Sequence, residues 1–137
     1  HARHAAEDLP LEQLAQALLH EDTQTRLAAL RRLRRLGPGE AAAMASVVAP
    51  SLRAADERVQ ALALECLGQA GSAAAPHLQV MARRLLQGGE EVRAKAAWAL
   101  AELGLLAVPQ VEAIARDLDV GVDRALDQTT GPAATAA

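Results

Sequence analysis

Apolar positions repeat with a helical period in three similar segments of the chain, 25–37, 59–71 and 92–104. Small or apolar residues recur at the first, fourth, fifth, eighth, ninth and twelfth places, which in the second segment are Val59, Leu62, Ala63, Cys66, Leu67 and Ala70. Residues with this spacing share one face of an α-helix. We therefore predict three amphipathic helices that bury this face.

The ends of these three helices are also marked in the sequence. Asp22 and Asp56 precede the first two helices as N-cap candidates, and Glu90 and Glu91 stand near the start of the third. Each segment closes on a glycine, at positions 37, 71 and 104, so the period is 34 and then 33 residues. Glycine is the residue that most readily adopts the positive φ that ends many helices.

A second helix is predicted ahead of each of these segments, over 10–20, about 40–54, 76–87 and 109–118. Three of the four begin with proline, which is tolerated in the first turn of a helix. Pro50 lies inside the helix predicted over about 40–54 and is expected to bend that helix. The connections within a pair are short, so paired helices are expected to run antiparallel.

The predicted fold is all-α: a right-handed α-α superhelix, or α-solenoid, of about three and a half helix pairs. The expected repeats span about 8–37, 38–71, 72–104 and a truncated 105–128. Residues 1–7 are expected to form a flexible N-terminal segment and 129–137 a disordered or extended tail.

The repeat resembles the HEAT-repeat family, in particular the short repeats of phycobilin-lyase-like proteins, and the clearest match runs from Asp56 to Gly71. The resemblance implies a ladder of hydrogen bonds between successive repeats. In this chain the ladder positions that match the family are Asp22, Arg26, Asp56, Arg93 and Asp119. Gln60 and Asp123 stand where the family has arginine and Gly89 where it has aspartate, so the ladder is expected to be interrupted.

Composition agrees with a helical chain and limits its functions. Apolar residues make up 51% and aromatic residues 1%, with Trp98 the single tryptophan, which argues against a β-sheet protein. A net charge of −3 gives no general attraction to nucleic acid. The lone Cys66 excludes an internal disulfide, and no stretch is long and apolar enough to span a membrane.

An intracellular location is therefore expected, although peripheral membrane association stays open. The chain starts at His1, and removal of a plastid or mitochondrial transit peptide is one explanation.

Partner binding is expected on the concave surface, which in such repeats is lined by the second helix of each pair. The residues predicted to form this surface share the side opposite the apolar face: Leu27, Leu30, Arg31, Arg34, Leu64, Glu65, Arg93 and Trp98.

Two features of this surface have more than one interpretation. Trp98 either contacts a partner or packs on its own neighbouring helices. The run from Arg31 to Arg35 is a solvated helical face, a docking site for an acidic protein, or a site for anionic lipid or nucleic acid. Arg32 takes a position at which the other repeats have a small, buried residue. We therefore expect this flank of the first repeat to be open to water.

Catalytic and metal-binding patterns are missing from the sequence. The four histidines have no metal-ligand spacing, and Cys66 matches Ala99 on a buried face, so we expect an inert core thiol. We find no set of nucleophile, base and orienting group, and expect no cofactor.

The sequence therefore predicts a non-enzymatic protein–protein interaction module. It would act as an adaptor or as a small accessory subunit of a larger assembly. An organellar or photosynthetic assembly is one expectation. The alternatives are a bilin-lyase-like chromophore attachment factor and a nucleic-acid-binding HEAT-like domain.

Overall fold

The computed structural model describes residues 10–104, 108–109, 112–113 and 115–116, and this part of the chain contains helices and turns but no strand. The prediction of an all-α fold is confirmed at this level. The truncated fourth repeat lies for the most part outside the described residues, as do Asp119 and both predicted terminal segments.

The three predicted repeat helices are α3 (Thr23–Leu36), α6 (Glu57–Gln69) and α8 (Glu90–Leu103). Both predicted aspartate caps are confirmed. The Thr25 backbone N–H donates to Oδ2 of Asp22 at 2.9 Å, and the Arg58 backbone N–H donates to Oδ1 of Asp56 at 2.8 Å. These bonds satisfy amide groups that have no partner within the helix and so fix where α3 and α6 begin.

The start of α8 is built differently, because its N-cap residue is Gly89 and no side chain caps it by a hydrogen bond. The carboxylate of Glu57, from the first turn of α6, occupies the space that a β-carbon at position 89 would need. A negative charge at this end of a helix is favourable. The Glu57 carboxylate thus adds to the charge of Glu90 and Glu91 in the first turn of α8.

The predicted closing glycines all have positive φ: 98° at Gly37, 62° at Gly71 and 59° at Gly104. These are backbone conformations that residues with a β-carbon rarely adopt. The three glycines therefore mark the ends of α3, α6 and α8 at the predicted spacing.

The remaining elements are more broken than the pattern predicts. They are α2 (Leu11–Leu18), α4 (Pro38–Ala43), α5 (Ala45–Val48), the 3-10 helix η1 (Ala49–Arg53), the 3-10 helix η2 (Gly71–His77) and α7 (Leu78–Gln87). The expected helix over 40–54 is thus three short pieces, which break first at Met44, and Pro50 lies inside η1. Pro76 lies inside η2, so α7 begins two residues after it and not at the proline.

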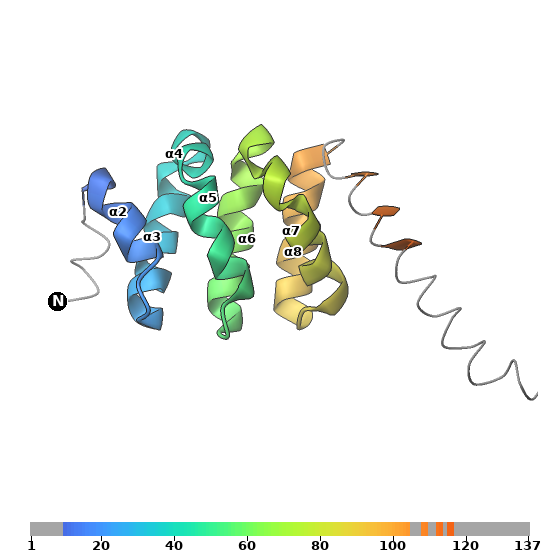
Figure 1. Cartoon of the computed structure of the whole chain (residues 1–137), viewed down its shortest axis with the longest axis horizontal. Coiled ribbons are helices and arrows are strands. Elements are labelled where there is room, and N and C mark those ends of the chain that lie inside the picture. Colours follow the sequence, from blue (N-terminus) through green and yellow to red (C-terminus); the bar gives the residue numbers. More distant parts are fainter. Residues whose placement is uncertain (1–9, 105–107, 110–111, 114, 117–137) are drawn as a thin grey trace, which may run out of the picture.

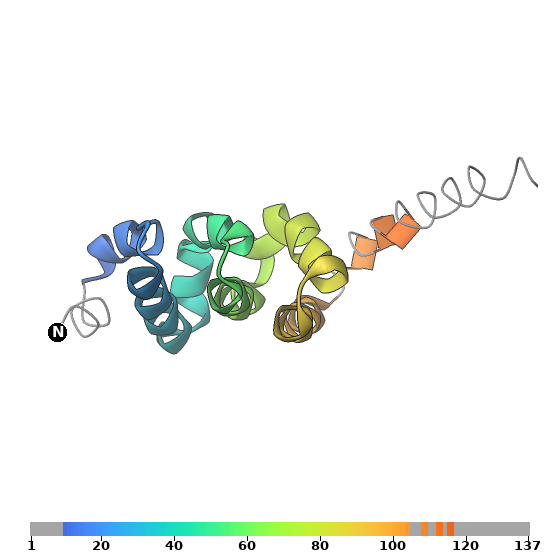
Figure 2. The same cartoon turned by 90° about the horizontal axis from the view of Figure 1, so that it is seen from below.

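The helices lie in two rows, as Figure 2 shows from below. One row holds α3, α6 and α8, and the other holds α2, α5 and α7 (Figures 1 and 2). In its row α6 is central, with α3 on one side and α8 on the other. The predicted buried face of α6 is confirmed, since the six residues of its apolar pattern are all at most 9% exposed.

Candidate functional site

Two adjoining open pockets lie over α6, between α3 and α8, with volumes of about 310 and 240 Å³. Arg34, Glu65 and Lys95 line both pockets, and we call the two pockets together the α6 groove. The other lining residues are Arg31, Arg58, Ala61, Leu62 and Glu91 in the larger pocket, and Gln69 and Trp98 in the smaller one.

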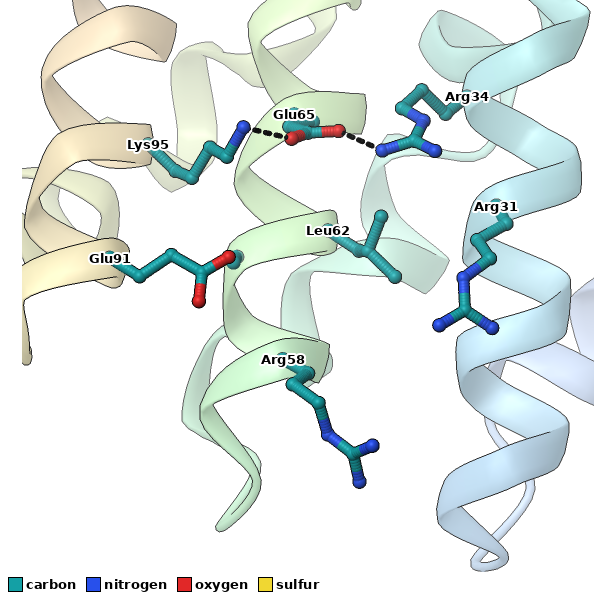
Figure 3. A pocket seen from close by; sticks show the side chains of 8 residues that line it. Arg31, Arg34, Arg58, Leu62, Glu65, Glu91 and Lys95 are labelled. Atoms are coloured by element: carbon teal, nitrogen blue, oxygen red, sulfur yellow. Dashed lines mark hydrogen bonds and ion pairs between the residues drawn. The ribbon is translucent and has the colours of Figure 1, made fainter.

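Glu65 holds the centre of the α6 groove (Figure 3). Its Oε2 accepts from Nη1 of Arg34 on α3 at 2.5 Å, and its Oε1 pairs with Nζ of Lys95 on α8 at 2.5 Å. The Glu65 side chain is 12% exposed, whereas Arg34 and Lys95 are 39% and 38% exposed. One carboxylate therefore links three successive repeat helices.

Two opposing effects act on the pKa of Glu65. Burial raises it, because a partly desolvated carboxylate prefers to be neutral. The hydrogen bonds from Lys95 and Arg34, together with their positive charges, outweigh burial and hold the pKa below its usual value. The ionised form of Glu65 is thus favoured by the folded state.

This shift predicts a pH-dependent contribution to stability. Because the pKa is depressed in the folded protein, the contribution is present above the ordinary glutamate pKa of about 4.3 and is lost as the pH falls through the lower folded value. We expect Glu65→Gln to lower the free energy of unfolding at pH 7 by on the order of 1 kcal/mol. The difference from the wild type should narrow below about pH 4 in urea unfolding curves.

Glu91→Gln is the matched control for this experiment, because Glu91 lines the same groove and has no ion-pair partner within the described ranges. Its pH profile should follow that of the wild type. A Glu65→Gln deficit that stays constant from pH 7 to pH 3 would show that the ion pairs do not stabilise the fold.

The other two cations of the groove differ in how they are paired. Arg58 donates from Nε and Nη2 to its own cap residue Asp56, at 3.1 and 2.8 Å, and these bonds lower the pKa of Asp56 to about 2. Arg31 is half-buried and has no ion-pair partner in the part of the chain that the structure describes. Arg31 is therefore the groove cation whose charge is least compensated.

Trp98 lines the smaller pocket and is partly packed and partly exposed. Its side chain is 41% exposed and lines the smaller pocket. Its ring also lies against α6, since a β-carbon at Gly68 would be 2.7 Å from Cζ3 of Trp98. The ring is thus anchored on a neighbouring helix while it presents an edge to solvent.

Four of the eight predicted partner-binding residues, Arg31, Arg34, Glu65 and Trp98, line the α6 groove. Arg93 is exposed but lines neither pocket. The prediction is wrong for Leu27, Leu30 and Leu64, which are fully buried at 0% exposure. Neighbouring helices, α2 and α6 for α3 and both α3 and α8 for α6, make the buried arc wider than one face, so these leucines lie within it.

Four polar lining residues were not predicted from the sequence: Lys95, Arg58, Glu91 and Gln69. Lys95 could have been found, because it takes the fourth place of its segment, where Leu62 and Ala28 stand in the other repeats. A charge at an otherwise apolar position indicates that the position is open to solvent or paired. Arg58, Glu65 and Gln69 are seven and four residues apart and so share one stripe of α6.

The hydrogen-bond ladder implied by the family resemblance does not form as expected within the described residues. Asp22 and Asp56 bond to Thr25 and Arg58 of their own helices and not to the next repeat. Gln60, which replaces an arginine of the pattern, instead donates from Nε2 to the Ala54 carbonyl at 2.6 Å. Arg32 is half-buried, so its flank of the first repeat is partly open to water.

Other candidate groups have structural roles. Cys66 is buried, as predicted, and contacts the Leu30 carbonyl through Sγ at 3.4 Å; burial raises the pKa of its thiol to about 12. Nδ1 of His20 accepts from the Asp22 backbone N–H at 3.0 Å. Within the described ranges, no three His, Cys, Asp or Glu side chains gather as a metal site, and no helix is long and apolar enough to cross a membrane.

Comparison of the chain with known protein families, curated proteins and solved structures finds no match. The resemblance to HEAT repeats thus rests on the residues of the repeat alone.

Proposed function

We propose that this chain is a short α-solenoid of the HEAT-like kind and acts as a non-enzymatic protein-interaction module, an adaptor or a small accessory subunit of a larger assembly. The α6 groove would be its binding surface. The observation that carries the proposal is that the two adjoining pockets place charged side chains from three helices beside the partly exposed Trp98. Tryptophan and arginine are the residues most enriched at interface hot spots.

The state of the reactive groups supports binding over catalysis. The Cys66 thiol has its pKa raised to about 12, so it stays protonated and is a poor nucleophile near neutral pH. Glu65 is held ionised between two cations, which makes it a weak proton donor or acceptor. Both properties suit groups that maintain the shape of a surface.

The experiment that tests this function compares partners captured by the wild type and by Trp98→Ala, with quantitative mass spectrometry as the readout. Removing the ring should reduce capture of groove-dependent partners by at least about tenfold, a loss of about 1.4 kcal/mol. The fold should persist, because the ring is only partly buried. We expect the melting temperature to fall by only about 3–5 °C, which corresponds to about 1 kcal/mol.

Leu19→Ala serves as the control, because Leu19 is an apolar side chain that is 58% exposed and lies outside the groove. It should retain every partner. If Trp98→Ala and Leu19→Ala capture the same proteins in the same amounts, the α6 groove is not the binding surface. A Trp98→Ala variant that loses its helical circular dichroism signal would show that Trp98 is required for the fold.

A further inference from the structure

Charge is distributed unevenly between the α6 groove and the whole chain. Four cationic side chains line the groove, Arg31, Arg34, Arg58 and Lys95, against the lining carboxylates Glu65 and Glu91 and Asp56, which pairs with Arg58, so the formal charge is 4 − 3 = +1. The chain as a whole carries a formal charge of −3. The groove is therefore a local positive site on an acidic protein.

The carboxylates already present do not saturate these cations. Both oxygens of Glu65 are engaged, one by Arg34 and one by Lys95, and Asp56 is engaged by Arg58. Arg31 is left without a carboxylate among the described residues. Figure 3 shows Arg31 on α3 and Arg58 on α6 on the same side of the pocket, with Leu62 between the two helices. An arginine fork in this position can bind an incoming carboxylate with two parallel hydrogen bonds.

The groove also has a defined length and an apolar end. From Arg58 to Gln69 the lining residues follow α6 for eleven residues, a rise of about 16 Å. An extended peptide covers this length with about five residues. The cationic end is at Arg31 and Arg58, whereas the Trp98 ring, which lines only the smaller pocket, offers an apolar contact away from it.

We propose that the α6 groove binds an extended acidic peptide segment of a partner protein, with a carboxylate on Arg31 and an apolar side chain against Trp98. This proposal rests on the proposed function and names the chemistry of the partner. Complementary charge favours a short acidic segment. A nucleic acid is disfavoured because its phosphates would continue beyond the groove and meet the net negative charge of the chain.

The test is a selection of random displayed peptides of about eight residues, long enough to span the groove, on the intact protein. Enriched peptides should contain more Asp and Glu than the starting library. Binding of a selected synthetic peptide is then followed by Trp98 fluorescence, which is unambiguous because the chain has one tryptophan and no tyrosine. The dissociation constant should rise as salt is raised from about 50 to about 500 mM.

Two variants with the same charge change make the test specific. Arg31→Glu should weaken binding of the selected peptide by at least about tenfold. Arg83→Glu changes an exposed arginine on α7, outside the groove, and should weaken it by less than about twofold. Circular dichroism checks that both variants keep the wild-type helix content.

Each other outcome overturns the proposal in a distinct way. The enriched peptides could instead be neutral or basic and lose affinity with Trp98→Ala but not with Arg31→Glu. This result would show that the groove is a binding site but has no preference for acidic segments. A selection with no groove-dependent peptide would overturn this proposal and the proposed function together. Tighter binding of a DNA duplex than of any acidic peptide, abolished by Arg31→Glu, would assign the groove to nucleic acid.

Discussion

Leu64→Ala is expected to lower the free energy of unfolding by about 2–5 kcal/mol, the range for removing a buried leucine side chain. Leu64 is fully buried, and it lies on α6, which has neighbours on both sides in its row. The substitution would leave a cavity that the surrounding helices cannot easily fill. Chemical denaturation at constant pH, followed by circular dichroism, measures the change.

The control for this substitution is Leu19→Ala, which removes the same atoms from a side chain that is 58% exposed. Its effect should stay within about 0.5 kcal/mol. Similar, small losses for both variants would mean that Leu64 is on the surface after all, where the sequence pattern had placed it.

Gly68→Ala is expected to destabilise the protein by about 1–3 kcal/mol, although alanine normally favours a helix. A β-carbon at position 68 would lie 2.7 Å from Cζ3 of Trp98 and 3.0 Å from both Cα and Cβ of Ala99. The ring can rotate away, but the α8 backbone at Ala99 can only move with its helix. The close packing of α6 on α8 thus requires glycine here.

The opposite result is expected for Gly39→Ala in α4, where an added β-carbon would meet nothing within 4 Å and φ is not positive. That variant should be as stable as the wild type or gain up to about 1 kcal/mol. In the double variant Gly68→Ala/Trp98→Ala the clash with the ring is relieved and the clash with Ala99 stays. A double variant as stable as Trp98→Ala alone would show that the ring is the whole obstacle.

The elements that could be predicted from the sequence are those specified by local chemistry. An aspartate that binds the first free amide groups and a glycine with positive φ act within a few residues, so Asp22, Asp56, Gly37, Gly71 and Gly104 all have the predicted role. The breaks in the other row have no comparable signal. Met44 interrupts the helix predicted over 40–54 without a glycine or proline at that position, although methionine is a good helix former.

Only part of the candidate site could be predicted, because the rest depends on contacts between helices. Helical periodicity identifies the centre of the buried face correctly, but it does not say how many neighbours a helix has. On α6 the neighbours α3 and α8 cover both flanks, so Leu64 and Gly68 are buried. The residues of α6 that stay at least partly exposed are Glu57, Arg58, Glu65 and Gln69. The ion pairs of Glu65 join residues about 30 positions apart, a separation that periodicity cannot pair.

The placement of Glu57 beside Gly89 has a consequence for the cooperativity of unfolding. No side chain caps the start of α8 by a hydrogen bond, and the carboxylate of Glu57 lies at this helix end only when α6 and α8 are packed together. Part of the free energy that defines α8 therefore belongs to the interface between two repeats. Such coupling favours the melting of neighbouring repeats together.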